Sequence, residues 1–161
     1  MTMLTTFARY NRWANRLVLD ALALRDVAAL QAPQPVVFGS LLATVHHVLA
    51  MSEVWQAHLE GRPHGYTSRM PAPGPGLAEI AARQGAIDDW LVDLCADGGD
   101  WDARVAFTFI GGGAGAMTRG EIVLHLVNHA TYHRGHIAAC LNAMGHGLPA
   151  SDLPVFLAAG G

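Results

Sequence analysis

The sequence contains nine histidines, and four of them fall in one segment: His125, His129, His133 and His136. Residues four apart share a helix face about 6 Å apart along the axis, so His129 and His133 can converge on one metal ion. His125 lies eight residues before His133, about 12 Å along the axis and rotated by roughly 80°. A straight helix therefore supplies only two ligands from this segment. His136 is interpreted as lying beside the ligands or at the surface.

A third imidazole must come from a facing helix, and another segment offers the adjacent residues His46 and His47. Both flank the same broad apolar face, so helical periodicity does not choose between them. Three imidazole ligands leave a coordination position open, which is typical of a catalytic rather than a structural metal. The alternative is that these histidines are hydrogen-bonded residues of the core.

Other residues offer weaker chemistry, and no catalytic residue is assigned. Glu53 and Glu121 are the candidates for a general base, with solvated or capping roles as the alternative. Arg134 could bind a substrate carboxylate or join an ion pair within or between helices. Asn11 and Asn15 could line the pocket, orient an imidazole, or form hydrogen bonds in the core.

Several known kinds of site are excluded by spacing. A di-iron carboxylate site needs Glu-x-x-His pairs, and the spacing from Glu121 to His125 is one residue too long. The sequence contains no His-Glu-x-x-His or Cys-x-x-Cys motif. His58, His64 and His146 lie near predicted helix ends or in loops, where we expect solvated side chains.

Four amphipathic segments are predicted to form helices, at residues 2–24, 40–60, 77–96 and 118–145. Ser40 is an expected N-cap, and Thr118 with Glu121 has the sequence form of a capping box. Residues 63–76, rich in Pro and Gly, predict an irregular connection, residues 101–110 a short extended segment, and residues 111–115 a flexible turn. The pattern predicts an all-α four-helix bundle that forms a single domain over residues 1–161.

The amino-acid composition and charge limit the binding partners and the location that we expect. Apolar residues make up 52% of the chain and charged residues 14%, which favours a homodimer that covers part of the apolar surface. The formal charge is −3 without a cluster of Lys or Arg, so nucleic-acid binding is not expected. Three arginines interrupt the apolar positions of residues 1–19, which argues against a signal peptide or membrane span. We expect Cys95 and Cys140 to be buried free thiols, as is typical of proteins in the reducing cytoplasm.

The segment Asn128-His-Ala-Thr-Tyr-His-Arg-Gly-His-Ile137 resembles the signature N-H-x-T-x-H-R-G-Q-I of the DinB/YfiT-like metalloenzymes. Residues 10–15, residues 44–55 and the tail at residues 145–157 are similar to the same family. In this register His46 takes the place of the family's Asn and His47 that of its metal-binding His. The family usually has Gln where this sequence has His136. This difference affects only a role of residue 136 beside the ligands or in the pocket lining, and not the set of ligands.

The resemblance implies an up-down-down-up bundle, commonly a dimer, with a divalent metal on His47, His129 and His133. Zinc or nickel is the expected ion, with iron or copper as alternatives. The family's assigned activities imply a transferase that joins a low-molecular-weight thiol to an electrophile. A metal-water hydrolase is the nearest alternative, and a non-enzymatic dimeric binding or stress protein with a structural metal is the competing class.

Overall fold

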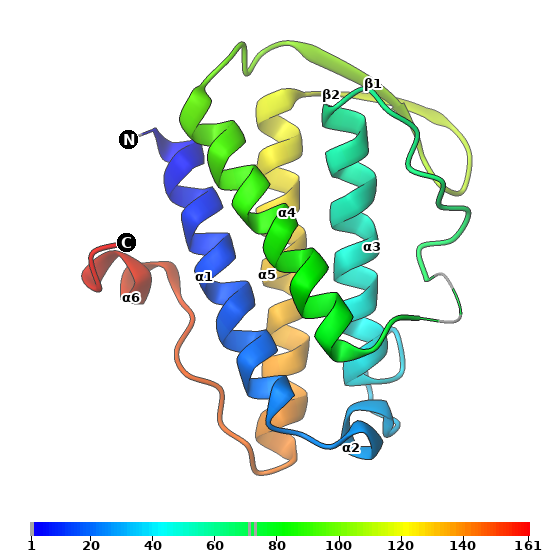
Figure 1. Ribbon diagram of the computed structural model, residues 1–161, viewed down its shortest axis with the longest axis vertical. Coiled ribbons are helices and arrows are strands. Elements are labelled where there is room, and N and C mark those ends of the chain that lie inside the picture. Colours follow the sequence, from blue (N-terminus) through cyan, green and yellow to red (C-terminus); the bar gives the residue numbers. More distant parts are fainter. Residues whose placement is uncertain (1, 71, 73) are drawn as a thin grey trace.

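Four long helices dominate the computed structural model, which describes residues 2–70, 72 and 74–161 (Figure 1). They are α1 (Met3–Ala23), α3 (Leu41–Leu59), α4 (Leu77–Asp97) and α5 (Arg119–Ala143). The short helices are α2 (Val27–Gln31) and α6 (Leu153–Ala158), and the strands are β1 (Arg104–Thr108) and β2 (Ala114–Thr118). The all-α prediction is correct for most of the chain, and the two-stranded sheet is the departure from it.

Two of the long helices, α3 and α5, begin at the caps that the sequence predicts. The Ser40 side chain accepts a hydrogen bond from the Ala43 backbone N–H at the start of α3. At the start of α5, Thr118 and Glu121 form both hydrogen bonds of the predicted capping box. Each cap satisfies backbone N–H groups that have no partner within the helix, which is why sequence located these boundaries to within one or two residues.

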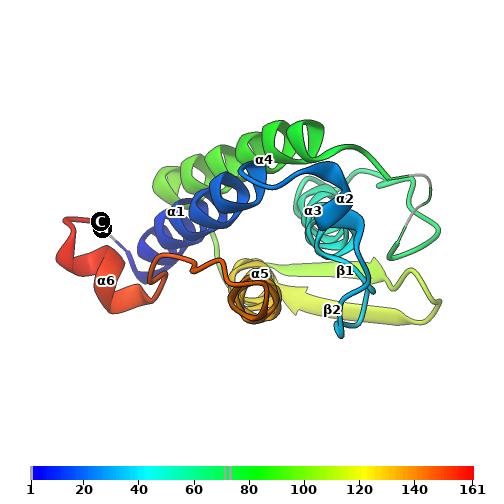
Figure 2. The same cartoon turned by 90° about the horizontal axis from the view of Figure 1, so that it is seen from below.

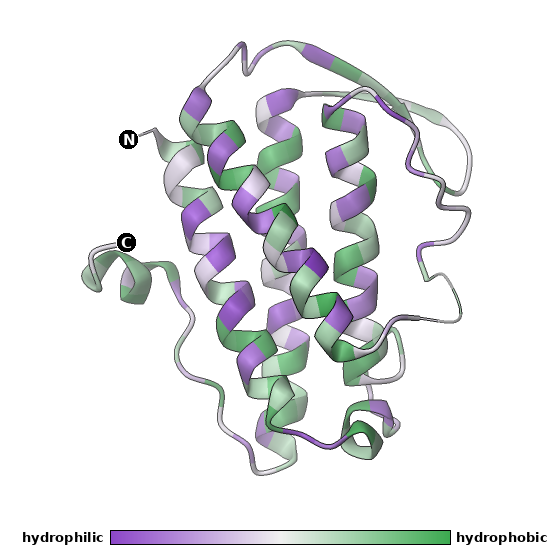
Figure 3. Ribbon diagram, viewed as in Figure 1, coloured by the Kyte–Doolittle hydropathy of each residue, from purple (hydrophilic) through white to green (hydrophobic). Residues whose placement is uncertain are grey.

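Each long helix packs against two others: α1 contacts α4 and α5, and α3 contacts the same two helices. Figure 1 shows α1 and α5 running in one direction and α3 and α4 in the other. Figure 2, a view along the helices, shows α3 and α5 as neighbours, with the two strands beside α5 and below α3. Hydrophilic and hydrophobic residues alternate along the long helices (Figure 3), as expected for helices with one buried face.

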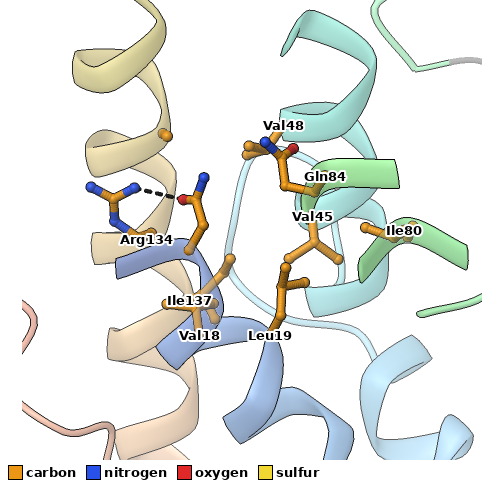
Figure 4. Close-up of a pocket in the computed structure, with 10 residues that line it drawn as sticks. Val18, Leu19, Val45, Val48, Ile80, Gln84, Arg134 and Ile137 are labelled. Carbon is orange, nitrogen blue, oxygen red and sulfur yellow. Dashed lines mark hydrogen bonds between the residues drawn. The ribbon is translucent and has the colours of Figure 1, made fainter. Parts of the chain in front are cut away.

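The core between the four helices is apolar and closely packed. Its fully buried members include Leu22, Leu41, Leu49, Ile80 and Ile137. A cavity of about 20 Å³ lies among Val18, Val45, Ile80 and their neighbours (Figure 4). That volume has room for roughly one water molecule, so this cavity is too small to be a substrate pocket.

The β1–β2 hairpin covers the outer face of α3. Its antiparallel register pairs Phe107 with Gly115. The Phe107 ring lies over Gly115 so closely that a Cβ atom there would be 2.6 Å from the ring. The other side of the Phe107 ring meets Trp55 of α3, with ring centroids 4.8 Å apart. β1 matches the predicted extended segment, whereas β2 was not predicted because its small residues carry little strand propensity.

The connection between α3 and α4, which we call the crossing segment (residues 61–76), is irregular as predicted. Pro71 and Pro73 of this segment lie outside the described residues. Tyr66 fastens it to both helices, because its hydroxyl donates to Glu53 of α3 and lies 3.3 Å from the Arg83 guanidinium of α4. Within the described part of the chain, no helix is long and apolar enough to cross a membrane.

Candidate metal centre

Three histidines from two helices meet between α3 and α5. His47 of α3 and His129 and His133 of α5 each offer one ligand atom, and these atoms lie within 4.8 Å of one another. The Nε2 atoms of His47 and His129 are 3.0 Å apart. The structure therefore brings together the three residues that the sequence predicted as ligands, and His46 is not part of this cluster.

A backbone group fixes the orientation of His47. Its Nδ1 lies 2.9 Å from the carbonyl oxygen of Arg69 in the crossing segment. Because a carbonyl can only accept, Nδ1 carries the proton, and in the neutral ring Nε2 keeps its lone pair. That lone pair faces the neighbouring imidazoles. Such a contact on the far nitrogen is the usual way proteins orient a metal-binding histidine.

Burial keeps these imidazoles neutral. It lowers the pKa of His129 to about 3, with further lowering from the charges of His133, His47 and His125. Burial, followed by the charges of His47 and His136, lowers the pKa of His133 to about 4. The pKa of His47 is also lowered by burial, although the hydrogen bond to Arg69 acts in the opposite direction. At neutral pH all three rings are neutral, with one protonated and one unprotonated nitrogen each, which is the form that binds metal.

One buried nitrogen of the cluster has no partner. The Nδ1 atom of His133 is inaccessible to solvent and makes no hydrogen bond within the described residues. Leaving a buried polar atom unpaired costs about 1–3 kcal/mol. The three neutral nitrogen donors, with no carboxylate among them, fit an ion that prefers imidazole ligands.

Aromatic rings enclose the three histidines. Phe38, from the loop before α3, stacks on His47 with ring centroids 4.0 Å apart and lies 5.6 Å from the His133 ring. On the other side, the His125 ring lies 4.9 Å from Trp55 and 5.6 Å from His129. These rings shield the imidazoles from water and hold them in place. Phe38 was not predicted, because it lies in a loop where periodicity carries no signal.

Arg134 does not face this site. It is 5% exposed, and its guanidinium donates to Asn11 Oδ1 at 2.8 Å and to Asn15 Oδ1 at 2.6 Å. Both asparagines in turn donate to the Asp88 carboxylate of α4, at distances of 3.0–3.2 Å. Figure 4 shows Arg134, with a dashed line for one of its hydrogen bonds. The Arg134 side chain is therefore hydrogen-bonded inside the bundle. Asn11 and Asn15 form hydrogen bonds in the core, which is one of the three roles considered for them.

The two candidate bases are engaged elsewhere as well. Glu53 accepts hydrogen bonds from Arg83 at 2.8–2.9 Å and from Tyr66. Glu121 forms the capping box of α5 and is exposed. Neither carboxylate belongs to the histidine cluster.

The remaining histidines lie outside the cluster. His46 is buried, and its ring packs against Gly74 of the crossing segment. The His136 ring is half-buried, 5.6 Å from the His133 ring, as expected for a residue beside the ligands. His58 and His64 pack with ring centroids 5.3 Å apart, and His146 Nδ1 lies 2.8 Å from Arg25. These last three have partners that sequence did not reveal.

The fold and this site define a helical protein with three neighbouring histidines that could hold a metal ion. The model of the DinB family matches residues 1–160, and the chain belongs to this family. The resemblance that the sequence motifs indicate is thereby confirmed. A search of curated proteins finds no match to the chain.

Proposed function

We propose that the chain is a DinB-like metal-dependent enzyme in which His47, His129 and His133 bind one divalent ion. The observation that supports this most is the convergence of three neutral nitrogen donors from two helices within 4.8 Å. The helix contacts and directions support the further proposal of an up-down-down-up four-helix bundle that forms one domain. Zinc or nickel is the proposed ion, because imidazole suits both, with iron or copper as alternatives.

The proposed reaction is the transfer of a low-molecular-weight thiol to an electrophile. A divalent ion held by three neutral ligands keeps its full charge and lowers the pKa of a thiol or water that it binds. The thiol sulfur forms a bond to an electrophilic carbon, the leaving group departs with its bonding electrons, and the thiol proton passes to water. Because Glu53 and Glu121 are bonded elsewhere, a reaction that needs no carboxylate base is favoured.

The chain's own residues supply position and shielding. The Arg69 carbonyl holds the His47 ring so that its unprotonated nitrogen faces the cluster. Phe38 covers the His47 ring and excludes water from that side. A low local dielectric strengthens every electrostatic interaction at the site.

Metal analysis and a substrate panel test this proposal. We expect purified protein to contain about one ion per chain, and chelation followed by metal addition to remove and restore turnover of a thiol such as glutathione or cysteine with 1-chloro-2,4-dinitrobenzene. Thiol-independent hydrolysis of p-nitrophenyl acetate would instead favour the hydrolase. Full metal occupancy without turnover would favour the non-enzymatic binding or stress protein.

We also propose that the protein is a cytoplasmic homodimer. Large hydrophobic side chains remain exposed on several elements, among them Val37, Phe109, Leu124 and Tyr132. A second copy could cover part of this surface. The two buried cysteines are free thiols, which suits a reducing compartment. Analytical ultracentrifugation tests the dimer, and a single species at the monomer mass across micromolar concentrations would contradict it.

A further inference from the structure

A cleft of about 280 Å³ opens between α3, the crossing segment and the hairpin. Met51 and Trp55 of α3 and Phe107 and Phe109 of the hairpin line it, and the Trp55 and Phe107 rings pack against each other. Arg69 of the crossing segment completes the lining. The cleft is therefore a mostly apolar slot with one cation, and none of its lining residues is among the three histidines.

This cleft adjoins the histidine cluster at three points. Met51 lies one helical turn beyond His47 on the same helix. The Trp55 ring contacts His125, and the His125 ring contacts His129. The backbone carbonyl of Arg69 accepts the hydrogen bond from His47, and Arg69 is also one of the residues that line the cleft. A molecule held in the cleft would thus lie beside the proposed ion.

Arg69 is the one charged side chain among the residues that line the cleft. The five ion pairs found in residues 2–70, 72 and 74–161 do not include it. No carboxylate is among the residues that line the cleft, so no acidic group there offsets the charge of Arg69. Phe109, which lines the cleft, is 54% exposed, so apolar surface is open for a ligand to cover.

We propose that this cleft binds the electrophilic substrate, and that this substrate is a carboxylate with an aromatic or aliphatic body. The Arg69 guanidinium forms paired hydrogen bonds with the carboxylate, and the body lies on the apolar surface that Met51, Trp55 and the two phenylalanines form. A phosphate dianion fits less well, because one cation would leave its second charge against apolar walls. Arg69 is then the residue that determines specificity. The inference rests on the proposed function only in calling the ligand a substrate.

Binding of a simple acid and its neutral analogue tests the inference. Calorimetric titration of the metal-loaded protein with 3-phenylpropionate and with 3-phenylpropanamide separates the charge from the apolar body. We expect the acid to bind at least tenfold more tightly than the amide. Arg69→Gln, which keeps the backbone carbonyl, is expected to remove that preference and leave amide binding unchanged.

Arg62→Gln is the matched control, because Arg62 is an exposed arginine of the same segment that pairs with Glu60 and does not line the cleft. It is expected to bind the acid as wild type does. Equal binding of acid and amide, or equal effects of the two arginine variants, would overturn the inference. So would inorganic phosphate that competes with the acid at similar concentration.

Repeating the titration on metal-free protein separates this inference from the proposed function, since a carboxylate could also bind an ion directly. We expect the effect of Arg69→Gln to persist without metal. Acid binding that needs the metal and ignores Arg69 would overturn the inference and leave the metal site standing. Acid binding that depends on Arg69, in a protein that takes up no metal, would support the cleft and reject the metal enzyme.

Discussion

The Nε2 atoms of His47 and His129 lie 3.0 Å apart although the two residues are 82 positions apart in the chain. Two Nε2 lone pairs that face each other at this distance are unfavourable unless a proton or a cation lies between them. In the metal-free protein one neutral ring can donate to the other. With an ion bound, both lone pairs can point at the same centre.

Replacing His129 by Ala is expected to abolish binding of one divalent ion while leaving helical content nearly unchanged. The apolar core, rather than the ion, holds a bundle of this size together. Metal content after dialysis and far-ultraviolet circular dichroism provide the two measurements. His136→Ala, on the same helix but outside the cluster, is the control and is expected to keep the ion. Wholesale unfolding on chelation of the wild type would contradict the prediction.

Substitutions at the two adjacent histidines of α3 are expected to differ. His47→Ala removes a proposed ligand, so metal content is expected to fall to background. His46→Ala is expected to keep the metal, because this ring packs against Gly74 outside the cluster. Titration with zinc in competition with a chromogenic chelator measures both affinities. The reverse order would show that the wrong histidine has been assigned.

Arg134→Met is expected to destabilise the fold by about 3–5 kcal/mol, because it leaves the buried Asp88 carboxylate without a compensating charge. The matched control is Arg12→Met, which removes the exposed ion pair between α1 and Asp89 of α4 and is expected to cost less than about 1 kcal/mol. Urea unfolding followed by circular dichroism measures both. Equal effects would mean that the buried network adds no more than a surface pair.

The metal-free protein is expected to lose stability as the pH falls from about 6.5 towards 4. The pKa of His129 drops from 6.5 to about 3 and that of His133 to about 4 on folding, so the unfolded chain binds more protons within this window. Acidification therefore favours unfolding. Burial raises the pKa of Asp88 to about 6, which acts in the opposite direction.

A variant isolates the contribution of the histidines to that pH dependence. His129→Gln with His133→Gln removes both titrating rings and leaves Asp88 in place. We expect its melting temperature to fall less than that of the wild type between pH 6.5 and 4. Parallel curves for the two proteins, measured without metal, would rule out the histidines as the source.

Local patterns were sufficient to predict the long helices and part of the site. Capping residues and apolar periodicity located α1, α3, α4 and α5, because both act within a few residues of the chain. The convergence of His129 and His133 follows from helical spacing alone. The choice of His47 over His46 does not, because it depends on how α3 is rotated against α5, and only the family motif indicated it.

The unpredicted parts depend on contacts between distant segments. Phe38 reaches His47 from a loop, and the Arg69 carbonyl belongs to an irregular connection whose path no periodicity describes. Arg134 follows His133 in the motif, yet its side chain turns to Asn11 and Asn15 on α1. The residue types are compatible with these hydrogen bonds, but whether they form depends on how α1 packs against α5.

The acceptor for His47 belongs to the main chain of residue 69, so every amino acid at that position would present the same oxygen. A substitution of the Arg69 side chain can therefore change which molecules bind in the neighbouring cleft. The orientation of the His47 ring stays the same. Relatives that differ at this position could share one inorganic centre and act on chemically unlike compounds. The backbone of residue 69 thus serves the metal centre, whereas its side chain serves substrate selectivity, and the two can evolve separately.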